Sequence, residues 1–134
     1  MRKQLSVWGL ILGLVFMGQL KAYAADANQD KEMYMQYCSS CHGPDGKGSG
    51  SVSAFLKVKV PDLTPLKKNN KGVYPVDQVI LAIDGRRKLR SHGDPKMPVW
   101  GESFSSEVKD AKTAEVTIGL KEKAIAEYVA TLQR

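Results

Sequence analysis

The sequence predicts an all-α fold, with short helices near both ends of the chain joined by long loops. Two stretches repeat apolar residues at helical spacing, one after Pro75 and one near the C-terminus. Glycine and proline are frequent elsewhere, with 12 Gly and 6 Pro in 134 residues, which indicates loops. No stretch shows a convincing β-strand pattern. With 43% hydrophobic and 25% charged residues, the chain is typical of one globular domain.

The first expected helix covers residues 30–37 and runs into Cys38. It contains good helix formers, and its first turn carries Asp30 and Glu32, where the helix dipole favours acids. Residues 43–53 are rich in glycine and serine and are expected to form turns and loop. A helix therefore leads into the only two cysteines of the chain and stops soon after them.

The second expected helix follows Pro75 and stops at Gly85, since proline is favoured at a helix start and glycine just past its end. Its apolar residues at helical spacing are Val76, Val79, Ile80 and Ile83. Residues 86–105 contain two prolines and two glycines, so we expect an extended, irregular segment there.

The last expected helix runs from about Leu120 to Gln133. One apolar stripe follows it, formed by Leu120, Ile125, Tyr128, Val129 and Leu132. We expect the preceding stretch, Ser105 to Ile118, to be a surface loop. Three short helices bury little surface by themselves, so a large apolar cofactor would supply the missing core.

Residues 1–24 have the pattern of an export signal. Arg2 and Lys3 precede a run without charge from Leu5 to Leu20, and Ala22-Tyr23-Ala24 offers a small-x-small cleavage site. The mature protein would then be residues 25–134, a single domain outside the cytoplasm, in the periplasm. The alternative is an uncleaved membrane anchor formed by residues 4–20, which glycines and a glutamine weaken.

Positive charge is concentrated in the middle of the chain. The net charge of +6 becomes +3 without the leader, because 17 basic and 14 acidic residues remain. Residues 57–96 carry 10 of these basic residues and 4 of the acids. An exported chain with so short a basic segment does not suggest nucleic acid as a partner. A positive face that steers an acidic protein partner fits better, and the alternative for any single lysine of this segment is an ordinary solvated surface.

Both cysteines and one histidine form the pentapeptide Cys38-Ser39-Ser40-Cys41-His42. This is the Cys-x-x-Cys-His pattern of covalent c-type haem attachment. On a helical turn the two thiols face one side and reach the two vinyl groups along one porphyrin edge, and His42 can hold the iron. The pattern therefore predicts one haem c per chain, linked through Cys38 and Cys41.

Three other interpretations of the cysteine pair are weaker. A thioredoxin-like redox centre follows a strand in a βαβ unit, which this chain does not predict. A zinc site needs a second pair of ligands, which the sequence does not supply. A structural disulfide suits an oxidising compartment but does not explain the adjacent histidine.

Met97 is the expected second axial ligand of the haem iron. It lies 55 residues after His42, and Pro98 holds its backbone extended. Met33 and Met35 precede Cys38 on the same helix and are expected to pack in the core. His92, five residues before Met97, is the rival ligand. Ligation by histidine and methionine raises the reduction potential, as in cytochromes c.

These residues give the chain a resemblance to the class I c-type cytochromes, in particular to the small exported bacterial proteins with one haem. The resemblance covers nearly all of residues 28–134. The specific part is the haem motif together with Met97-Pro98-Val99-Trp100-Gly101. The resemblance implies the cytochrome c fold, with short helices and long loops wrapped around one haem.

The resemblance also assigns roles to single residues. Tyr34 and Tyr128 match aromatic positions of the terminal helices, which would cross and pack near those rings. The carbonyl of Pro61 would accept the Nδ1 proton of His42 and fix its tautomer. The family usually has glycine eight residues before the first cysteine, where this chain has Asp30.

Other residues are expected around the haem. Trp100 would pack beside the Met97 segment, and one of Arg86, Arg87 and Arg90 would neutralise a haem propionate. His92 could instead bond to a propionate. The lysines that could surround the exposed haem edge are Lys57, Lys59, Lys67, Lys68 and Lys71.

The resemblance implies an electron carrier, not an enzyme by itself, that docks redox proteins through the basic 57–96 segment. Two alternatives remain within haem proteins. The chain could be the haem subunit of a larger oxidoreductase complex, or a ligand-binding or peroxidase-like protein if Met97 is a weak ligand. Without haem, it would be a small exported thiol–disulfide or binding module.

Overall fold

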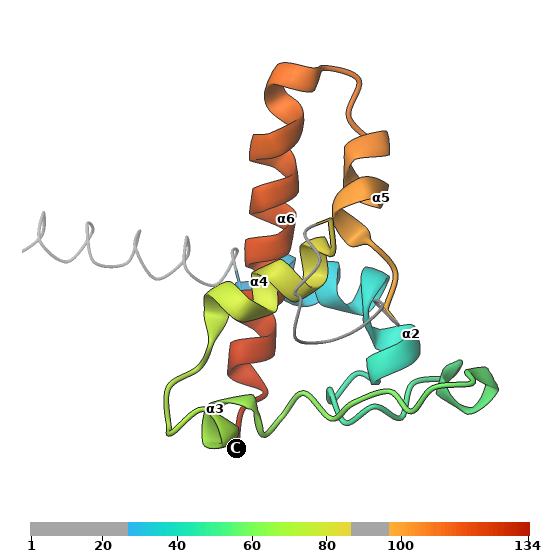
Figure 1. Cartoon of the computed structure of the whole chain (residues 1–134), viewed down its shortest axis with the longest axis vertical. Coiled ribbons are helices and arrows are strands. Elements are labelled where there is room, and N and C mark those ends of the chain that lie inside the picture. Colours follow the sequence, from blue (N-terminus) through green and yellow to red (C-terminus); the bar gives the residue numbers. More distant parts are fainter. Residues whose placement is uncertain (1–26, 87–96) are drawn as a thin grey trace, which may run out of the picture.

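The computed structural model describes residues 27–86 and 97–134 (Figure 1). Residues 27–37 are helical. The elements that follow are α2 (Ser39–His42), the 3₁₀ turn η1 (Ser53–Phe55), α3 (Leu66–Asn69), α4 (Val76–Asp84), α5 (Trp100–Ser106) and α6 (Ala111–Thr131). These residues include no strand, which confirms an all-α chain over the described part. The expected export signal, Arg87, Arg90 and His92 lie outside the described residues.

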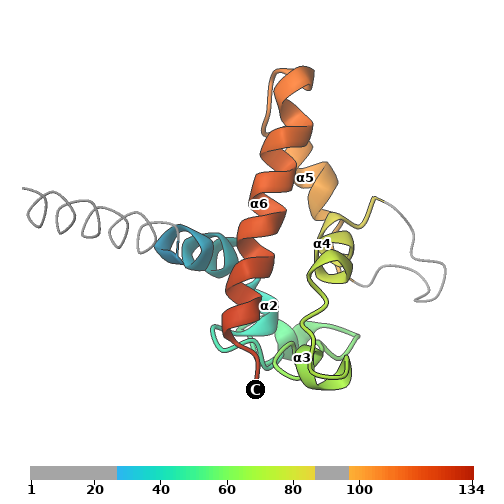
Figure 2. The same ribbon diagram turned by 90° about the vertical axis from the view of Figure 1, so that its left-hand side faces the viewer.

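The long helix α6 forms the spine of the molecule. The helix α5 runs antiparallel beside it, and α4 crosses near its middle, so that these three helices pack against one another (Figure 1). The helix of residues 27–37 crosses α6 at a steep angle (Figure 2). The small helices α2 and α3 lie near the C-terminal end of α6, and long loops connect them.

The crossing of the two terminal helices is centred on two tyrosines. The rings of Tyr34 and Tyr128 are 4.9 Å apart between centroids and inclined at 43°, a favourable arrangement for aromatic pairs. Tyr34 is fully buried. The predicted contact is therefore confirmed, and it forms with Asp30 at the position where the resembling family usually has glycine.

The helix α4 has the predicted ends. Pro75 occupies the position before its first turn, and Gly85 ends it with a φ of 65°. This left-handed conformation suits glycine, because it lacks a Cβ atom. Ile83 points into the core, and Val79 and Ile80 pack partly buried against it.

The expectation of an irregular segment over residues 86–105 is wrong for its described end, because α5 begins at Trp100. Pro98 and Val99 lead the chain into this helix, and Phe104 is fully buried. Trp100 and Phe104 are one turn apart, stacked with centroids 5.8 Å apart, and both rings contact Tyr37. Packing against a distant helix therefore stabilises a short helix that the local sequence does not indicate.

The expectation of a surface loop from Ser105 to Ile118 is also wrong, because α6 begins at Ala111. Its N-cap is Asp110, whose side chain accepts a hydrogen bond of 3.1 Å from the backbone N–H of Lys112. The helix is therefore about nine residues longer at its N-terminal end than predicted.

The predicted stripe of α6 is confirmed at Ile125 and Val129, which are buried, and at Tyr128 and Leu132, which pack partly buried against the core, but it is wrong at Leu120. The buried apolar residues of α6 are Ala114, Ile118, Ile125, Ala126 and Val129. Most of these positions recur at intervals of four and seven, which keeps them on one face of a helix. Leu120 is two residues beyond Ile118 and points away, with 64% of its surface exposed. Ile118, expected in a loop, is a core residue at 1%.

Candidate functional site

The pentapeptide with both cysteines folds as a continuation of the N-terminal helix. The backbone N–H of Cys38 donates to Tyr34 (2.9 Å), and the N–H of His42 donates to the carbonyl of Cys38 (2.9 Å). Cys38 forms a turn, and α2 follows it directly. Cys38, Cys41 and His42 therefore lie on one helical turn, as the spacing predicts.

The loop after α2 folds back onto the motif. Four backbone N–H groups of this loop donate to carbonyls of residues 39–42: Gly43 to Ser39 (2.9 Å), Val52 to Ser40 (2.9 Å), Gly50 to Cys41 (3.0 Å) and Gly48 to His42 (2.8 Å). The last carbonyls of a helix have no partner within it. Here the loop supplies those partners and fixes the position of the motif.

Two glycines allow this close approach. A Cβ atom on Gly50 would lie 2.2 Å from the carbonyl oxygen of Ser40, and one on Gly48 would lie 2.4 Å from that of Val60. Gly48 also has a φ of 81°. Larger residues therefore cannot occupy either position without moving backbone. The sequence indicated a loop here, but it did not indicate that the loop is seated on the motif.

Tyr34 connects the helix crossing to this loop. Its buried hydroxyl donates a hydrogen bond of 2.7 Å to the carbonyl of Gly43. Burial, with a smaller contribution from Cys38, raises the pKa of Tyr34 well above its usual value, so the hydroxyl remains a donor. The same residue that packs on Tyr128 therefore also holds the residue after His42.

His42 is buried, with 7% of its surface exposed, and its ring is held at one nitrogen. Nδ1 lies 3.2 Å from the carbonyl oxygen of Pro61. A carbonyl can only accept, so this bond requires the proton on Nδ1 and leaves the lone pair on Nε2. Burial lowers the pKa of His42, and the bond to Pro61 opposes that effect in part. The predicted partner of the histidine is confirmed.

Both thiols are free. Cys38 is buried and Cys41 is half-buried. Burial, followed by the neighbouring Cys41, raises the pKa of the Cys38 thiol to about 12. Reactive cysteines of thiol–disulfide enzymes have lowered pKa values, because the thiolate is the attacking form. The environment of Cys38 has the opposite effect, because it raises the pKa of the thiol.

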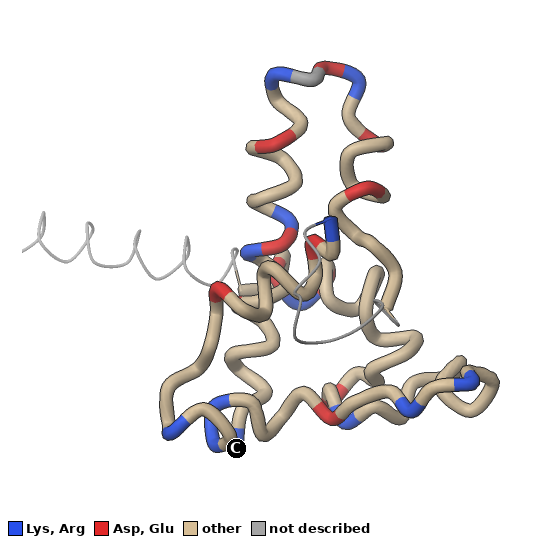
Figure 3. The backbone as a smooth tube through the Cα atoms, in the orientation of Figure 1, with Lys and Arg blue, Asp and Glu red and all other residues tan. Residues whose placement is uncertain are grey.

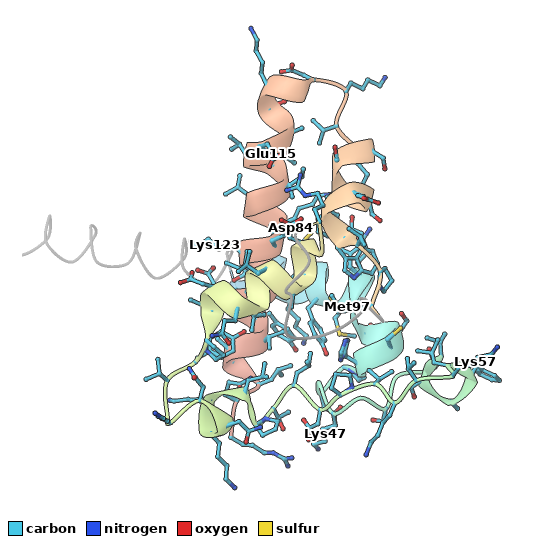
Figure 4. The ribbon with its side chains drawn as sticks, in the orientation of Figure 1. Lys47, Lys57, Asp84, Met97, Glu115 and Lys123 are labelled. Carbon is cyan, nitrogen blue, oxygen red and sulfur yellow. The ribbon has the colours of Figure 1, made fainter. Side chains whose placement is uncertain are left out.

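Met97 is half-buried and packs against the cluster of buried residues that includes Cys38. Its side chain lies between α4 and α2 in the view of Figure 4. Trp100 begins the next helix and contacts Tyr37 with ring centroids 5.5 Å apart. The structure therefore brings the segment with Met97 to the same core as the cysteine motif, although the two are far apart in sequence.

Met33 and Met35, on the helix of residues 27–37, differ in their surroundings. Met33 packs against the core as expected, whereas Met35 is exposed, so the expectation of core packing is wrong for it. Met35 lies one residue after the fully buried Tyr34, on a different side of the helix.

Arg86 is engaged with protein carboxylates. Its Nε lies 2.5 Å from Oδ1 of Asp84, and its Nη1 lies 2.8 Å from Oε1 of Glu115. Arg86 thus links the end of α4 to α6, where Figure 4 labels both acids. These bonds, together with the acids' charges, raise its pKa.

A buried carboxyl group lies close to this network. Glu122 on α6 is 4% exposed, and its Oε1 has no hydrogen-bond partner. Burial, then the negative charge of Asp84, raises the pKa of Glu122 to about 7; Arg86 opposes the shift, and Glu115 adds to it. The sequence offered no signal for this group, because it depends on the end of α4 meeting α6.

Residues 27–86 and 97–134 contain no three His, Cys, Asp or Glu side chains placed to hold a metal ion. No helix in this part is long and apolar enough to cross a membrane. Comparisons with protein-family models, curated proteins and solved structures found no match.

Proposed function

We propose that the chain is an electron-transfer protein of the class I c-type cytochrome kind, with one haem c attached to Cys38 and Cys41. The observation that carries this proposal is the bond between His42 Nδ1 and Pro61 within the Cys-x-x-Cys-His turn. It leaves Nε2 as the free nitrogen of a rigidly placed imidazole. That is what an axial ligand of haem iron requires.

The donor chemistry of the chain fits haem. Two free thiols and an imidazole share one helical turn, and a thioether sulfur, that of Met97, packs against the same core. Bound haem would supply an iron that alternates between the ferric and ferrous states. With His42 and Met97 on its two sides, both axial positions would be filled by protein, which suits a carrier rather than an enzyme.

The polypeptide's own part in this function is to hold its ligands still. Pro61 fixes the tautomer of His42, and the glycine loop fixes the backbone on which His42 and Cys41 lie. Burial of the imidazole keeps water from it. Rigid ligands keep rearrangement small when an electron arrives or leaves.

The proposed partners are redox proteins that dock through the basic 57–96 segment. Its described lysines, Lys57, Lys59, Lys67, Lys68 and Lys71, are all exposed. They fall into two groups, one on the loop around η1 and one around α3, which lie at opposite ends of the lower part of Figure 3. Docking by lysines predicts an association that weakens with salt. A periplasmic location belongs to the same proposal.

The strength of the bond between Met97 and the iron separates an electron carrier from a ligand-binding or peroxidase-like haem protein. A carrier, free or as the haem subunit of an oxidoreductase complex, needs a firm bond. A ligand-binding or peroxidase-like protein needs a weak one. A thiol–disulfide function is disfavoured, because Cys38 is buried and its pKa is raised.

The first experiment is maturation of the full chain in a host that attaches haem c. Intact mass is expected to show polypeptide plus one haem, with loss of attachment in the double variant Cys38→Ser and Cys41→Ser. A mass of polypeptide alone for the wild-type chain would overturn the proposal.

The second experiment tests the axial ligand. The ferric wild-type protein is expected to show the absorption band of methionine sulfur bound to iron. Met97→Ala should abolish it and open the iron to carbon monoxide in the reduced state. Met35→Ala is the matched control, since Met35 is exposed. Ready binding of carbon monoxide by the reduced wild-type protein would favour the ligand-binding function instead.

A further inference from the structure

A loop carrying η1 extends from the body of the molecule. Residues 50–60 run away from α2, turn through η1 (Ser53–Phe55) and return towards Pro61 (Figure 1). Lys57 lies at the outer end of this loop in Figure 4. The loop is fixed at its base, because Val52 N–H donates to Ser40 (2.9 Å). It is therefore a projecting feature on a rigid attachment.

The end of the loop exposes large apolar side chains. Phe55 is 85% exposed, and its neighbours Val52 and Leu56 are exposed as well. Val52 and Phe55 are three residues apart across this 3₁₀ turn, so they lie on the same side of it, and Leu56 follows in an extended conformation. Apolar residues gathered at one exposed place mark an interaction surface, whereas single ones are ordinary.

Three backbone N–H groups of this turn donate hydrogen bonds within the loop. Ser53 N–H and its hydroxyl both donate to Gly50 (3.0 and 2.7 Å), Phe55 N–H donates to Val52 (3.0 Å) and Leu56 N–H donates to Ser53 (3.3 Å). An unpaired backbone group is costly to move out of water. This turn can therefore enter a less polar phase with little penalty from these N–H groups.

The charges around the turn have one sign. Residues 46–61 contain three lysines, Lys47, Lys57 and Lys59, and no acid. Figure 3 shows basic positions along this loop, with acidic ones only near its base. Lys57 and Lys59 are exposed and directly follow the apolar residues.

From these observations we propose that this loop docks the protein on a lipid bilayer rich in anionic phospholipids. Phe55 inserts at the boundary of headgroups and acyl chains, with Leu56 and Val52 beside it, and Lys57 and Lys59 contact the anionic headgroups. The surface is defined by residues 52–59. It does not depend on the proposed electron transfer.

Two features favour a bilayer over a protein as the partner. The apolar turn projects from the body of the molecule (Figure 1), so a fluid surface can surround it without a preformed pocket. Its cations are all lysines, and lysines beside exposed aromatic and aliphatic residues are typical of segments that lie on membranes. One aromatic residue and a few lysines give weak, reversible binding.

The test is sedimentation of the haem-loaded chain with vesicles, comparing phosphatidylcholine alone with phosphatidylcholine containing phosphatidylglycerol. Binding is expected only to the anionic vesicles and should be lost at ~1 M salt, where charges are screened beyond about 3 Å. Phe55→Ala should weaken partitioning about tenfold. The double variant Lys57→Glu and Lys59→Glu should weaken it about tenfold or more.

Matched controls lie in the first half of α6 and just before it, away from this loop (Figure 1). Leu120→Ala removes another exposed apolar residue, on α6, and Lys109→Glu with Lys112→Glu makes the same change of charge. These variants should bind like the wild-type chain. The absorption spectrum should be unchanged in all of the loop and control variants, which shows that haem attachment is intact and separates this test from the proposed function.

Three results would overturn the proposal. The first is that the wild-type chain does not sediment with anionic vesicles. The second is that the control variants lose as much binding as the loop variants. The third is that the chain ignores vesicles but Phe55→Ala slows its electron exchange with an acidic redox protein, which would make the loop a protein-docking surface.

Discussion

The imidazole of His42 and the carbonyl of Pro61 are 19 residues apart in sequence and are joined by a contact of 3.2 Å. This contact decides which ring nitrogen is available. The intervening loop is held by its own hydrogen bonds to residues 39–42, so neither partner can drift far from the other. Because the imidazole is already oriented, little free energy is needed to position it for binding. The residue is therefore preorganised to act as a ligand.

We predict that the Nδ1 proton of His42 exchanges slowly with solvent. The proton is held by the Pro61 carbonyl, and the ring is buried. Nitrogen-resolved NMR of the reduced protein should show a protected ring N–H on Nδ1. Exchange at the rate of an exposed histidine would contradict the hydrogen bond.

Gly50→Ala should disturb the motif itself. Its Cβ would meet the carbonyl oxygens of Ser40 and Ser39 at 2.2 and 2.5 Å, so the backbone must move. We expect a loss of about 2 kcal/mol or more in the free energy of unfolding, with less haem attached during maturation. Denaturant unfolding and intact mass measure the two effects.

Gly119→Ala is the control for that change. Gly119 lies inside α6, and a Cβ there would have no neighbour within 4 Å. Alanine is favoured over glycine within a helix, so this variant should be more stable by about 0.5–1 kcal/mol. Equal destabilisation by both substitutions would show that Gly50 is not seated as described.

The buried face of α6 can be tested by two truncations. Ile118→Ala should lower the free energy of unfolding by about 2–5 kcal/mol, because Ile118 is 1% exposed within the core. Leu120→Ala should change it by about 0.5 kcal/mol or less, because Leu120 is 64% exposed. Urea unfolding measures both. A larger loss of stability for Leu120→Ala than for Ile118→Ala would mean that Leu120, and not Ile118, lies on the buried face of α6.

Glu122 should make stability depend on pH. Its pKa is raised from 4.5 to about 7 in the folded protein, so between these values the folded state binds more protons than the unfolded state. Stability from this group is therefore full at low pH and falls as pH rises towards 7. The complete loss amounts to about 3 kcal/mol at most.

Glu122→Gln isolates this effect. The amide stays neutral, so the variant should match the wild-type chain near pH 5 and exceed it near pH 8, as measured by urea unfolding. Taking the difference between the two proteins cancels other titrating groups, including His42. An identical pH profile for both proteins would mean that Glu122 becomes charged in the folded protein at little cost in free energy, with Arg86 compensating for burial and for the charges of Asp84 and Glu115.

Sequence reasoning succeeded where a local rule was sufficient. Pro75 and Gly85 bound α4 as predicted, because each acts through its own backbone geometry. The turn from Cys38 to His42 followed from spacing along one helix. The pairing of Tyr34 with Tyr128 and the partner of His42 came from resemblance to a family, and both contacts are present.

The helices that sequence reasoning missed depend on distant contacts. Nothing within residues 98–106 predicts a helix, yet Trp100 and Phe104 form one because Tyr37 receives their rings. In the first half of α6, residues 111–119, few large apolar residues mark a stripe, and burial falls on Ala114 and Ile118. Small residues become buried where another helix packs closely against them, and a single stretch of sequence does not show where that happens.

By itself, the sequence determined the helical class of the chain, the Cys-x-x-Cys-His turn and the ends of α4, because each depends on residues within a few positions of one another. Only the tertiary structure decided that the glycine loop seats on the motif, that Oε1 of Glu122 is buried without a hydrogen-bond partner and that Phe55 projects into solvent. Burial and exposure belong to the packed molecule, since they depend on which distant segments meet and which are left apart.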